Sequence, residues 1–398
     1  MQSAGGNRGA ARYLRPAFDG RLEHCVPQSR ATVWPVRVSP GARPDEMTLL
    51  TLAQGGDHNA FAELAAAHRA ELRAHCYRML GSLHDAEDAL QEALLRAWRG
   101  LPGFERRSSL RSWLYAIATN AALDLARQRS RRELPVGFGP AAAGSARLDP
   151  SQADPLWLEP YPDQWLAEDR ASSPEARYEQ RESVELAFVV ALQHLPPLQR
   201  AVLLLREVAG FSTAEISHQL GTSAAAVNSA LQRARAAARD RLPAESQQAA
   251  LRQLGDERTR ALVRRYADAL ERGDADTLIS MLTEEATWSM PPEPDWFGGH
   301  QAIREFLLGG PLAVRWKHLA ARANGQLAVG CYMYYEVRGR YVPWVIDVLT
   351  LEGDKIAAVT AFLTAEAASP GRSGNQVSGT ELFARFGLPA EPGPARSG

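Results

Sequence analysis

Residues 210–237, GFSTAEISHQLGTSAAAVNSALQRARAA, carry the signals of two short helices joined by a tight turn. Ser212 is a predicted N-cap, and Glu215 three residues later completes a capping box. A glycine after the first helix supplies the turn, and Thr222 or Ser223 caps the second helix. This pattern predicts either a helix-turn-helix that places its second helix in a DNA major groove or an ordinary helical hairpin.

The second helix of this stretch has an apolar stripe and a polar face. Val227, Leu231 and Ala234 recur at helical spacing, so we expect them to face inward. The polar residues between them are then directed outward, where a helix in a groove contacts DNA: Asn228, Gln232, Arg233 and Arg235.

The length and charge of the chain limit the possibilities further. A chain of 398 residues is long enough for two or three domains, and its formal net charge is −1. Residues 104–132 hold seven Arg against two acidic residues, whereas residues 133–185 hold eleven acidic residues against four Arg. This order indicates one surface for a polyanion, followed by a segment that is kept away from it.

The cysteines and the apolar runs point to a cytoplasmic protein. Cys25, Cys76 and Cys331 are scattered without metal-ligand spacing, so we expect reduced thiols, no metal site and no cofactor. No run of about 18 apolar residues occurs, so we expect no membrane span. The first 46 residues contain Arg but lack the apolar core of a secretory signal.

Changes in composition and periodicity divide the chain into six parts. The predicted parts are, in order, a disordered N-terminal extension (1–46), a helical domain (47–132), an acidic aromatic linker (133–181), a second helical domain that ends with the helix-turn-helix (182–245), an α+β domain (256–368) and a tail with a short docking segment (369–398).

The predicted linker contains an aromatic and acidic island. Its sequence is WLEPYPD at 157–163, followed by Trp165. Solvated linkers rarely carry two Trp and a Tyr so close together, so we expect the island to dock on a folded domain.

The predicted helix 85–99 carries a polar face opposite its apolar stripe. Such a face is either solvated, which is the usual case, or it binds a partner. The residues that share it are Asp85, Asp88, Gln91 and Glu92.

The next predicted helix, 112–129, combines Arg with aromatic residues. Proteins that bind single-stranded nucleic acid typically use Arg side chains to bind phosphates and aromatic rings to stack on unpaired bases. Trp113 and Tyr115 lie near the start of the helix. Along one line of the helix and in the preceding loop lie Arg106, Arg107, Arg111, Asn120, Asp124, Arg127 and Arg131.

Taken in order, these segments resemble bacterial RNA polymerase sigma factors. YRMLGSLHDAEDALQEALLRAW (77–98) resembles regions 2.1–2.2, and FERRSSLRSWLYAIATNAALDLARQRSRR (104–132) resembles regions 2.3–2.4. LQHLPPLQRAVLLLREVAGFSTAEISHQLGTSAAAVNSALQRARA (192–236) is similar to region 4. Regions 1.2 and 3 have no counterpart, as in the extracytoplasmic-function (ECF) group. The WLEPYPD linker and the downstream domain resemble the sigma-G-like subgroup.

The resemblance implies partners and a role for each segment. The polar face of region 2.2 is expected to bind the β′ clamp helices of core RNA polymerase, and region 4 the β flap and the −35 element of promoter DNA. Regions 2.3–2.4 are expected to melt and read the −10 element. The implied core-binding residues are Asp85, Asp88, Gln91 and Glu92. The implied −10 residues are Phe104, Arg106, Arg107, Arg111, Trp113, Asn120, Asp124, Arg127 and Arg131. The implied −35 residues are Thr222, Ser223, Ala225, Asn228, Gln232, Arg233 and Arg235.

One departure concerns the recognition helix. Many members of the family carry Lys and Arg in a T-V-K-S-R motif, where this chain has AVNSA at 226–230. Two cationic contacts are therefore missing, although Asn228 can still read adenine. We expect weaker or differently specified −35 binding.

The α+β part resembles the cone of SnoaL-like (NTF2-like, cystatin-like) proteins. Trp288, Trp296, Phe297 and Trp344 are expected to face its interior, where Trp288, Trp296 and Trp344 would line a ligand pocket together with Asp347. The fold class is therefore two all-α helical domains followed by an α+β cone, with a possible small-molecule ligand in the cone.

Asp347 lies among apolar residues on a predicted strand, on the same face as Val345. It is either a base with a raised pKa or a carboxylate paired with Arg338, Arg340 or His318. We favour the pair and assign no catalytic residue, because fold does not carry chemistry with it.

Three functions follow from these patterns. The preferred one is an ECF sigma factor, not an enzyme, that starts transcription of a specific regulon and is modulated by its fused SnoaL-like domain. The alternatives are a cyclase or isomerase tethered to DNA, and a ligand-sensing repressor that binds duplex DNA without polymerase.

Overall fold

The computed structural model describes residues 45–129, 131–142, 156–166, 181–368 and 377–393. Apart from its last two residues, the predicted N-terminal extension 1–46 lies outside the described residues. Parts of the predicted linker and of the predicted tail also lie outside them.

The first helical domain begins close to the predicted boundary. Asp57, Ser82 and Ser109 cap its three longer helices, each accepting a backbone hydrogen bond from the first turn. Gly81 ends the second helix in the left-handed conformation, with φ of 69°. Its elements are α1 (Glu46–Gln54), α2 (His58–Leu80), α3 (Leu83–Gly100), the 3₁₀ turn η2 (Leu101–Gly103) and α4 (Leu110–Gln128).

The second helical domain contains the predicted helix-turn-helix. The capping box between Ser212 and Glu215 is present, and Ser223 caps the second helix. Val227, Leu231 and Ala234 are buried, as predicted. Its elements are α7 (Leu186–Gln193), α8 (Pro197–Leu203), the π turn η4 (Leu204–Val208), α9 (Thr213–Gln219) and α10 (Ala224–Arg239).

The C-terminal domain is a curved sheet with helices on both faces. Six strands are ordered β4-β3-β8-β7-β6-β5, and β3 and β8 form the parallel pair. The strands are β3 (Leu282–Ser289), β4 (Trp296–Gly298), β5 (Trp316–Ala323), β6 (Gln326–Tyr335), β7 (Arg340–Glu352) and β8 (Lys355–Leu363). The helices and turns are α11 (Gln247–Leu254), α12 (Asp256–Arg272), α13 (Ala275–Met281), α14 (Gly299–Gly309), η5 (Pro311–Ala313), η6 (Glu336–Arg338) and α15 (Gly379–Arg385).

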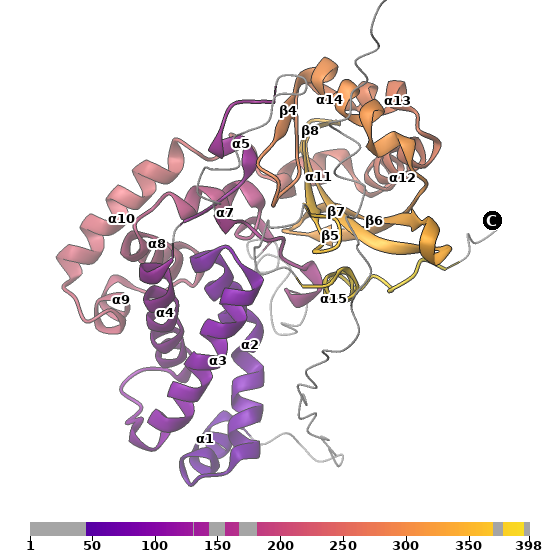
Figure 1. Cartoon of the computed structure of the whole chain (residues 1–398). Coiled ribbons are helices and arrows are strands. Elements are labelled where there is room, and N and C mark those ends of the chain that lie inside the picture. Colours follow the sequence, from indigo (N-terminus) through magenta and orange to yellow (C-terminus); the bar gives the residue numbers. More distant parts are fainter. Residues whose placement is uncertain (1–44, 130, 143–155, 167–180, 369–376, 394–398) are drawn as a thin grey trace, which may run out of the picture.

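The two faces of the sheet belong to two different cores. On the inner face, Leu327, Val329 and Val345 pack with residues of α12 and α14. On the outer face, Ala328 and Tyr332 join one continuous buried cluster with α2, α4, α8 and α15. The outer face of the C-terminal sheet is therefore buried against the rest of the protein (Figure 1).

The linker docks on the folded domains, as its aromatic island predicts. Trp157, Leu158 and Tyr161 are buried, and Figure 1 shows the linker elements between the helical domains and the sheet. The short elements of this segment are β1 (Arg132–Glu133), α5 (Pro135–Phe138), β2 (Leu156–Trp157), parallel to β1, and η3 (Asp163–Trp165).

Two short elements lie outside the predicted pattern. Residues 246–255, between the predicted second helical domain and the predicted α+β domain, contain α11, capped by Ser246. The loop after β3 contains β4, which pairs with β3 over only three residues. Both elements are short, so their period is weak in the sequence.

Candidate nucleic-acid and polymerase interfaces

The polar face of α3 is smaller than predicted. Asp88 and Gln91 are exposed and Glu92 is partly exposed, but Asp85 is only 1% exposed. The prediction that Asp85 shares the outer face is therefore wrong.

Asp85 is buried because two arginines surround it. Its Oδ2 accepts from Arg132 Nη2 at 2.7 Å, and its Oδ1 accepts from Arg129. Arg132 also donates to the Trp157 carbonyl at 2.8 Å, so it joins helix α3 to the linker. Asp85 therefore holds the structure together and is not available to a partner.

The predicted −10 loop is held by α1. Arg106, which has a positive φ of 59°, donates to Met47, Thr51 and Gln54. Gln54 in turn donates to the carbonyls of Leu101 and Phe104, at 3.2 and 2.9 Å. This role of α1 cannot be predicted from the sequence, because no periodic pattern links the helix to the loop.

The aromatic residues at the start of α4 are mostly packed. The rings of Phe104 and Trp113 lie 4.9 Å apart, and Phe104 is 9% exposed. Trp113 is half-buried, so one part of its ring remains accessible. Arg107 beside them is exposed and pairs with Glu105.

The predicted line of polar residues on α4 is present only in part. Asn120 and Arg127 are exposed, and Asp124 lies between Arg96 and Arg127, at 3.2 and 3.3 Å. Arg131 lies beyond the end of the helix and pairs with Glu133, so it leaves that line.

Arg111 joins the two helical domains. Its Nε lies 2.8 Å from Glu71 of α2, and its Nη1 donates to the carbonyl of Ala209 at 3.0 Å. The guanidinium also lies over the rings of Tyr115 and Phe211. Burial acts to lower the pKa of Arg111, but the nearby Tyr115 hydroxyl and the Glu71 carboxylate outweigh it, so the pKa is raised. In this arrangement Arg111 is occupied by protein contacts, although its side chain remains 38% exposed.

A second contact between the domains lies beside Arg111. Gln219 of α9 donates to Ser112 of α4 at 2.9 Å, and both side chains are buried. The first helix of the helix-turn-helix is thus packed against the helix that carries the predicted −10 residues.

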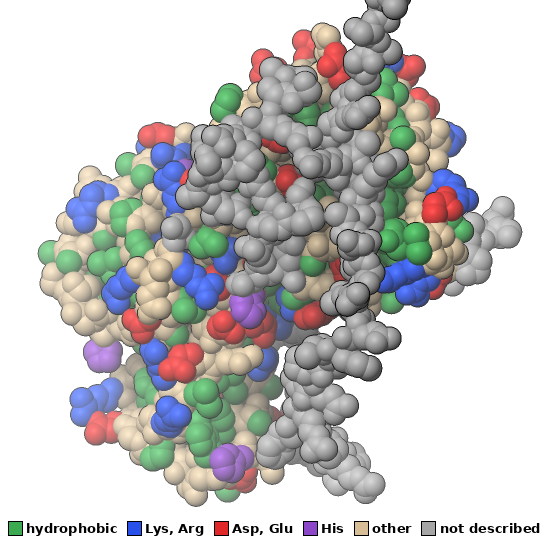
Figure 2. Space-filling view, viewed as in Figure 1, with side chains coloured by type: hydrophobic (Ala, Val, Ile, Leu, Met, Phe, Trp, Pro, Cys, Tyr) green, Lys and Arg blue, Asp and Glu red, His purple; other side chains and the backbone are tan. Residues whose placement is uncertain are grey.

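The predicted recognition helix α10 presents a coherent outer face. Asn228 accepts from the Thr213 hydroxyl at 3.3 Å, and Arg235 pairs with Glu207 at 2.5 Å. Figure 2 shows separate Lys and Arg side chains over the helical domains on this side, without one continuous basic patch. The exposed residues are Thr222, Ser223, Ala225, Asn228, Gln232, Arg233 and Arg235.

The linker binds to the N-terminus of α3. Glu159 accepts from the Ser82 hydroxyl at 2.9 Å and from the Leu83 amide at 2.8 Å, which satisfies amides that a helix start leaves unpaired. Burial raises the pKa of Glu159, although Arg132 and these hydrogen bonds oppose that effect. The Tyr77 hydroxyl donates to the Glu159 carbonyl at 2.7 Å.

Asn324 joins four segments of the chain. It lies in the β5–β6 turn with φ of 54° and is fully buried. Its backbone amide donates to the Tyr161 carbonyl, and its Oδ1 accepts from the Tyr161 amide, both at 2.8 Å. Its Nδ2 donates to the Tyr77 hydroxyl at 2.9 Å and to the Val184 carbonyl at 2.8 Å.

Two carboxyl groups reinforce this junction. Asp163 accepts from the Gly325 amide at 2.7 Å, and burial raises its pKa to about 6. Glu185 accepts from the amides of Gln247 and Gln248 at 3.0 and 2.9 Å, and burial raises its pKa to about 7. The linker, the start of the second helical domain and the sheet therefore meet at one buried polar cluster.

The C-terminal segment closes the outer face of the sheet. Tyr332 of β6 donates to the Pro389 carbonyl at 2.8 Å and packs edge-to-face on Phe383. Leu388 lies directly over Gly330, where a Cβ atom would collide with it. Gln164 of the linker donates to the Arg385 carbonyl, so the same segment also touches the linker.

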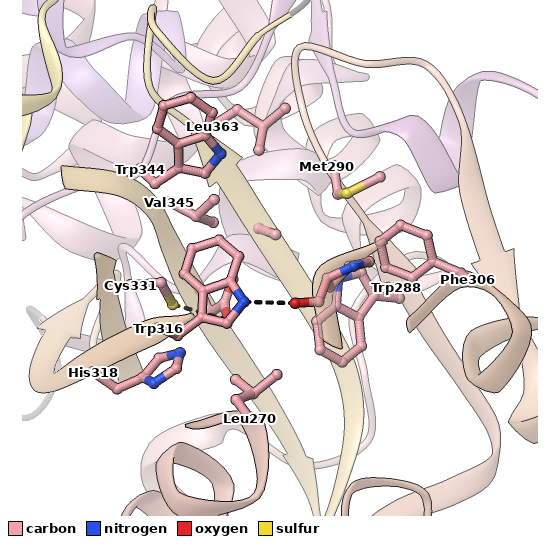
Figure 3. Close-up of a pocket in the computed structure, with 13 residues that line it drawn as sticks. Leu270, Trp288, Met290, Phe306, Trp316, His318, Cys331, Trp344, Val345 and Leu363 are labelled. Atoms are coloured by element: carbon pink, nitrogen blue, oxygen red, sulfur yellow. Dashed lines mark hydrogen bonds between the residues drawn. The ribbon is translucent and has the colours of Figure 1, made fainter. Parts of the chain in front are cut away.

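An apolar cavity lies on the inner face of the sheet (Figure 3). The empty space in and in front of it, open solvent included, is about 520 Å³. Trp288 and Trp344 line it as predicted, but Trp296 does not, because its indole donates to the Gly139 carbonyl instead. The complete lining is Leu270, Trp288, Met290, Phe306, Pro311, Trp316, His318, Cys331, Trp344, Val345, Asp347, Ala361 and Leu363.

Asp347 lies at this cavity without an arginine partner. Its Oδ2 accepts from the Tyr266 hydroxyl at 2.8 Å and from Cys331 Sγ at 3.3 Å. Burial raises its pKa, while these hydrogen bonds and His318 lower it less strongly. The predicted pairing with Arg338, Arg340 or His318 is not seen among the described contacts, and Tyr266 takes that place.

Membrane spans and metal clusters were both sought among the described residues. None of their helices combines the length and apolarity that a membrane span requires. No three of their His, Cys, Asp and Glu side chains gather so as to hold a metal ion.

Comparison with known proteins assigns the chain to a family. The family model for sigma-70 region 2 matches residues 64–132, that for sigma-70 region 4 matches 185–237, and that for the SnoaL-like domain matches 263–359. The ECF RNA polymerase sigma factor SigG of Mycobacterium tuberculosis is 42% identical over 345 residues, or 84% of each chain. This chain belongs to the ECF sigma factors.

Two further comparisons extend this result. The probable ECF RNA polymerase sigma factor SigI of Mycobacterium tuberculosis is 26% identical over 79% of this chain and 97% of its own. The crystal structure of the Mycobacterium tuberculosis ECF sigma factor SigJ superposes with a TM-score of 0.50 at 22% identity, covering 77% of this chain and 97% of that one. At this identity the likeness to SigJ concerns the fold alone.

The predicted resemblance and the predicted fold class are thus confirmed. Hereafter region 2 means residues 64–132 and region 4 means residues 185–237. Of the residues predicted for these ECF regions, those on α10 form one exposed face, whereas those around α4 divide between exposed and packed positions.

Proposed function

We propose that this ECF sigma factor acts in the cytoplasm, binds core RNA polymerase and starts transcription from promoters with −10 and −35 elements. One observation carries the proposal. The same folded chain has an exposed acidic face on region 2 and an exposed recognition helix in region 4.

 

A factor that bound only duplex DNA would gain nothing from an anionic surface, because DNA repels it. For this reason the acidic face of α3 favours a polymerase-bound factor over a repressor.

For core binding we propose the residues of the polar face of α3 that remain fully or partly exposed. Asp88, Gln91 and Glu92 lie at i, i+3 and i+4 and form one narrow polar stripe. The exposed Leu95, one turn further along, adds an apolar contact to that stripe. We assign this stripe to the β′ clamp helices, and region 4 to the β flap.

For promoter DNA we propose two surfaces. The −10 surface consists of the Phe104–Ser109 loop together with Asn120 and Arg127 of α4, which are exposed. The −35 surface is the outer face of α10, where Asn228 and Gln232 offer hydrogen bonds to base edges and Arg233 and Arg235 reach phosphates.

The arrangement of the two regions does not suit simultaneous reading of both elements. Elements at −10 and −35 lie about 25 base pairs apart, which is roughly 85 Å of B-DNA. Here Gln219 of α9 is hydrogen-bonded to Ser112 of α4 at 2.9 Å. We therefore propose that this is a closed form, and that regions 2 and 4 separate when the protein binds polymerase and promoter.

We propose that the SnoaL-like domain stabilises the closed form. Its Asn324 binds the linker, region 2 and the segment before region 4 at once. Its outer face shares one buried core with both regions. Opening must break these contacts, so the domain is expected to inhibit transcription until they are released.

Transcription with purified core polymerase tests both parts of the proposal. Genomic promoter fragments would be transcribed over several rounds with the full-length chain, with residues 47–245 alone, and with the full-length Gly330→Ala variant. Gly330→Ala is chosen because a Cβ atom there displaces Leu388 from the outer face of the sheet. The matched control is the double variant Gly330→Ala/Leu388→Ala, in which the smaller side chain leaves room for the new methyl group.

We expect promoter-specific transcripts from all four proteins, with more from residues 47–245 and from Gly330→Ala than from the other two. The absence of specific transcripts from every protein would overturn the sigma function. Specific transcription by the full-length chain, with less from residues 47–245 and from Gly330→Ala, would make the SnoaL-like domain a required part and not an inhibitor.

A further inference from the structure

The loop at residues 104–109, between η2 and α4, has few contacts of its own. Phe104 is buried, whereas the three residues after it are exposed. The internal contacts described for the loop are the ion pair of Arg107 with Glu105 and a hydrogen bond of 3.4 Å between its two neighbouring serines. A segment with so few contacts opens easily, so its shape must come from a neighbouring element.

Arg106 gives the loop a turn that needs support from outside. Its φ of 59° is unfavourable for a residue that carries a Cβ atom. Its guanidinium donates to α1, at 2.7 Å to Met47 Sδ, 3.2 Å to Thr51 Oγ1 and 3.3 Å to Gln54 Oε1. These acceptors lie at i, i+4 and i+7, on one face of α1. Arg106 therefore serves the shape of the loop, while Arg107 remains exposed.

Gln54 holds two separate points of the loop with one side chain. Its Nε2 donates to the carbonyls of Leu101 and Phe104, at 3.2 and 2.9 Å, and its Oε1 accepts from Arg106 at 3.3 Å. A carboxamide has a donor and an acceptor at once, which neither a carboxylate nor an apolar side chain offers. The start of the loop and its left-handed residue are therefore fixed relative to each other through Gln54.

These contacts are independent of the SnoaL-like domain. Helix α1 lies at the end of the first helical domain that is farthest from the C-terminal sheet (Figure 1). It also precedes residues 64–132, which the family model for region 2 matches. The contacts therefore add a helix from outside that segment to the −10 surface, and they do not depend on whether the protein is closed or open.

We propose that Gln54 is a positioning residue for reading the −10 element. It acts through the carbonyls of Leu101 and Phe104 and through Arg106, and it keeps the loop in the shape that receives an unstacked base of the non-template strand. A base that leaves the stack loses its stacking energy, which a pocket offsets fully only when its groups are already in place. This inference rests on the proposed function, because it needs the loop to bind the −10 element.

Selection from a pool of single-stranded DNA by the holoenzyme tests the inference. The probes are oligonucleotides with a short randomised segment. Those bound by core polymerase with the full-length chain are sequenced, and core polymerase alone is the reference. Gln54→Met keeps a long, unbranched side chain with good helix propensity but removes both the donor and the acceptor. We expect the enrichment of the base that the wild-type chain prefers to fall about tenfold in this variant, because its hydrogen bonds to the loop are lost.

Affinity for core polymerase separates positioning from a general loss of structure. Fluorescence anisotropy should give the same core affinity for Gln54→Met as for the wild-type chain, because the proposed core-binding stripe lies on α3. A variant whose helical domain is disrupted would lose core affinity and base preference together.

Two threonines of α1 form a matched pair. The Thr51 hydroxyl accepts from Arg106 at 3.2 Å, whereas Thr48 is exposed and its side chain has no described contact with the loop. Thr51→Ala should therefore lower the enrichment, by less than Gln54→Met does, and Thr48→Ala should leave it unchanged. Both changes are Thr to Ala on one helix, so a difference between them reports on the contact with the loop.

Trypsin cleavage of the free full-length chain measures the loop without DNA. Mass spectrometry follows the cuts after Arg106 and Arg107. We expect these cuts to be about tenfold faster in Gln54→Met than in the wild-type chain or in Thr48→Ala, because loss of the hydrogen bonds raises the population of the open loop.

Four outcomes would overturn the inference, and each is distinct. The same enrichment with the wild-type chain and with Gln54→Met would remove the positioning role and leave the proposed function intact. Unchanged cleavage in Gln54→Met would show that the loop keeps its shape without the side-chain amide. Loss of core affinity in Gln54→Met would give the residue a general structural role. No enrichment by the wild-type holoenzyme above core polymerase alone would remove the −10 function of the loop, and with it this inference, even if the cleavage rates changed as expected.

Discussion

The side-chain amide of Asn324 donates to the Tyr77 hydroxyl at 2.9 Å, and so joins the SnoaL-like domain directly to helix α2 of region 2. The two residues are 247 positions apart in the chain. Tyr77 also contacts the linker, because its hydroxyl donates to the Glu159 carbonyl. One hydroxyl thus connects the sheet, the linker and region 2.

Replacing Asn324 by Gly should open this junction. Glycine adopts the left-handed conformation of this turn without strain, so only the side-chain hydrogen bonds are lost. We expect a loss of unfolding free energy of about 2–4 kcal/mol, and faster proteolysis of the linker. Urea unfolding and limited trypsin digestion measure the two effects. Digestion at the wild-type rate, with unchanged stability, would contradict this role of Asn324.

The junction should also respond to pH through Asp163. Burial raises the folded-state pKa of this carboxyl to about 6, so the folded protein holds the proton more tightly than the unfolded chain does. The contribution of Asp163 to stability should therefore be fully present below about pH 4 and be lost as the pH rises toward about 6, by at most about 3 kcal/mol.

Asp163→Asn is the matched variant for this prediction. It keeps an oxygen that accepts from the Gly325 amide but no longer titrates. Unfolding by urea at a series of pH values should show that the difference between wild type and variant changes between about pH 4 and about pH 6. A constant difference across that interval would mean that the carboxyl does not titrate with a raised pKa.

The two aspartates of α3 should behave differently when changed. Asp88→Lys should weaken binding to core polymerase about tenfold or more, with the unfolding free energy changed by no more than about 0.5 kcal/mol. Asp85→Asn should reduce the unfolding free energy by about 3–5 kcal/mol, because Arg129 and Arg132 lose their shared anion. Fluorescence anisotropy measures the affinity of each variant for core polymerase, and urea unfolding measures its stability. Core affinity unchanged by Asp88→Lys would remove α3 from the polymerase interface.

Arg233 should contribute a phosphate contact in the −35 groove. For Arg233→Ala we expect weaker binding to −35 duplex DNA, and a slope of log affinity against log salt that is smaller by about 0.9. Arg258→Ala on α12 serves as the control, because this exposed residue lies outside region 4. An unchanged slope for Arg233→Ala would place that side chain away from the DNA backbone.

Much of the local structure could be predicted because its causes are local. The capping box of Ser212 and Glu215 lies within four residues, and the apolar stripe of α10 follows from helical spacing. The turn at Asn324 and Gly325 also has a local cause, because asparagine and glycine readily adopt the left-handed backbone conformation that such a hairpin turn requires.

The errors concern contacts between residues that are distant in the chain. Helical spacing places Asp85 beside Asp88, but it cannot show that Arg132 covers it after the chain turns back. In the same way, Trp296 reads as an interior residue until Gly139 of the linker accepts its N–H. Tertiary partners of this kind leave no periodic signal in the sequence.

The packing of Leu388 on Gly330 has a consequence for the synthesis of the protein. Residues 382–388 cover the outer face of the sheet, and they leave the ribosome more than 140 residues after the end of region 4 at residue 237. Regions 2 and 4 are synthesised long before this cover exists. During synthesis each new molecule therefore passes through an interval in which regions 2 and 4 exist and their closing segment does not, and closure can be completed only after residues 382–388 have emerged.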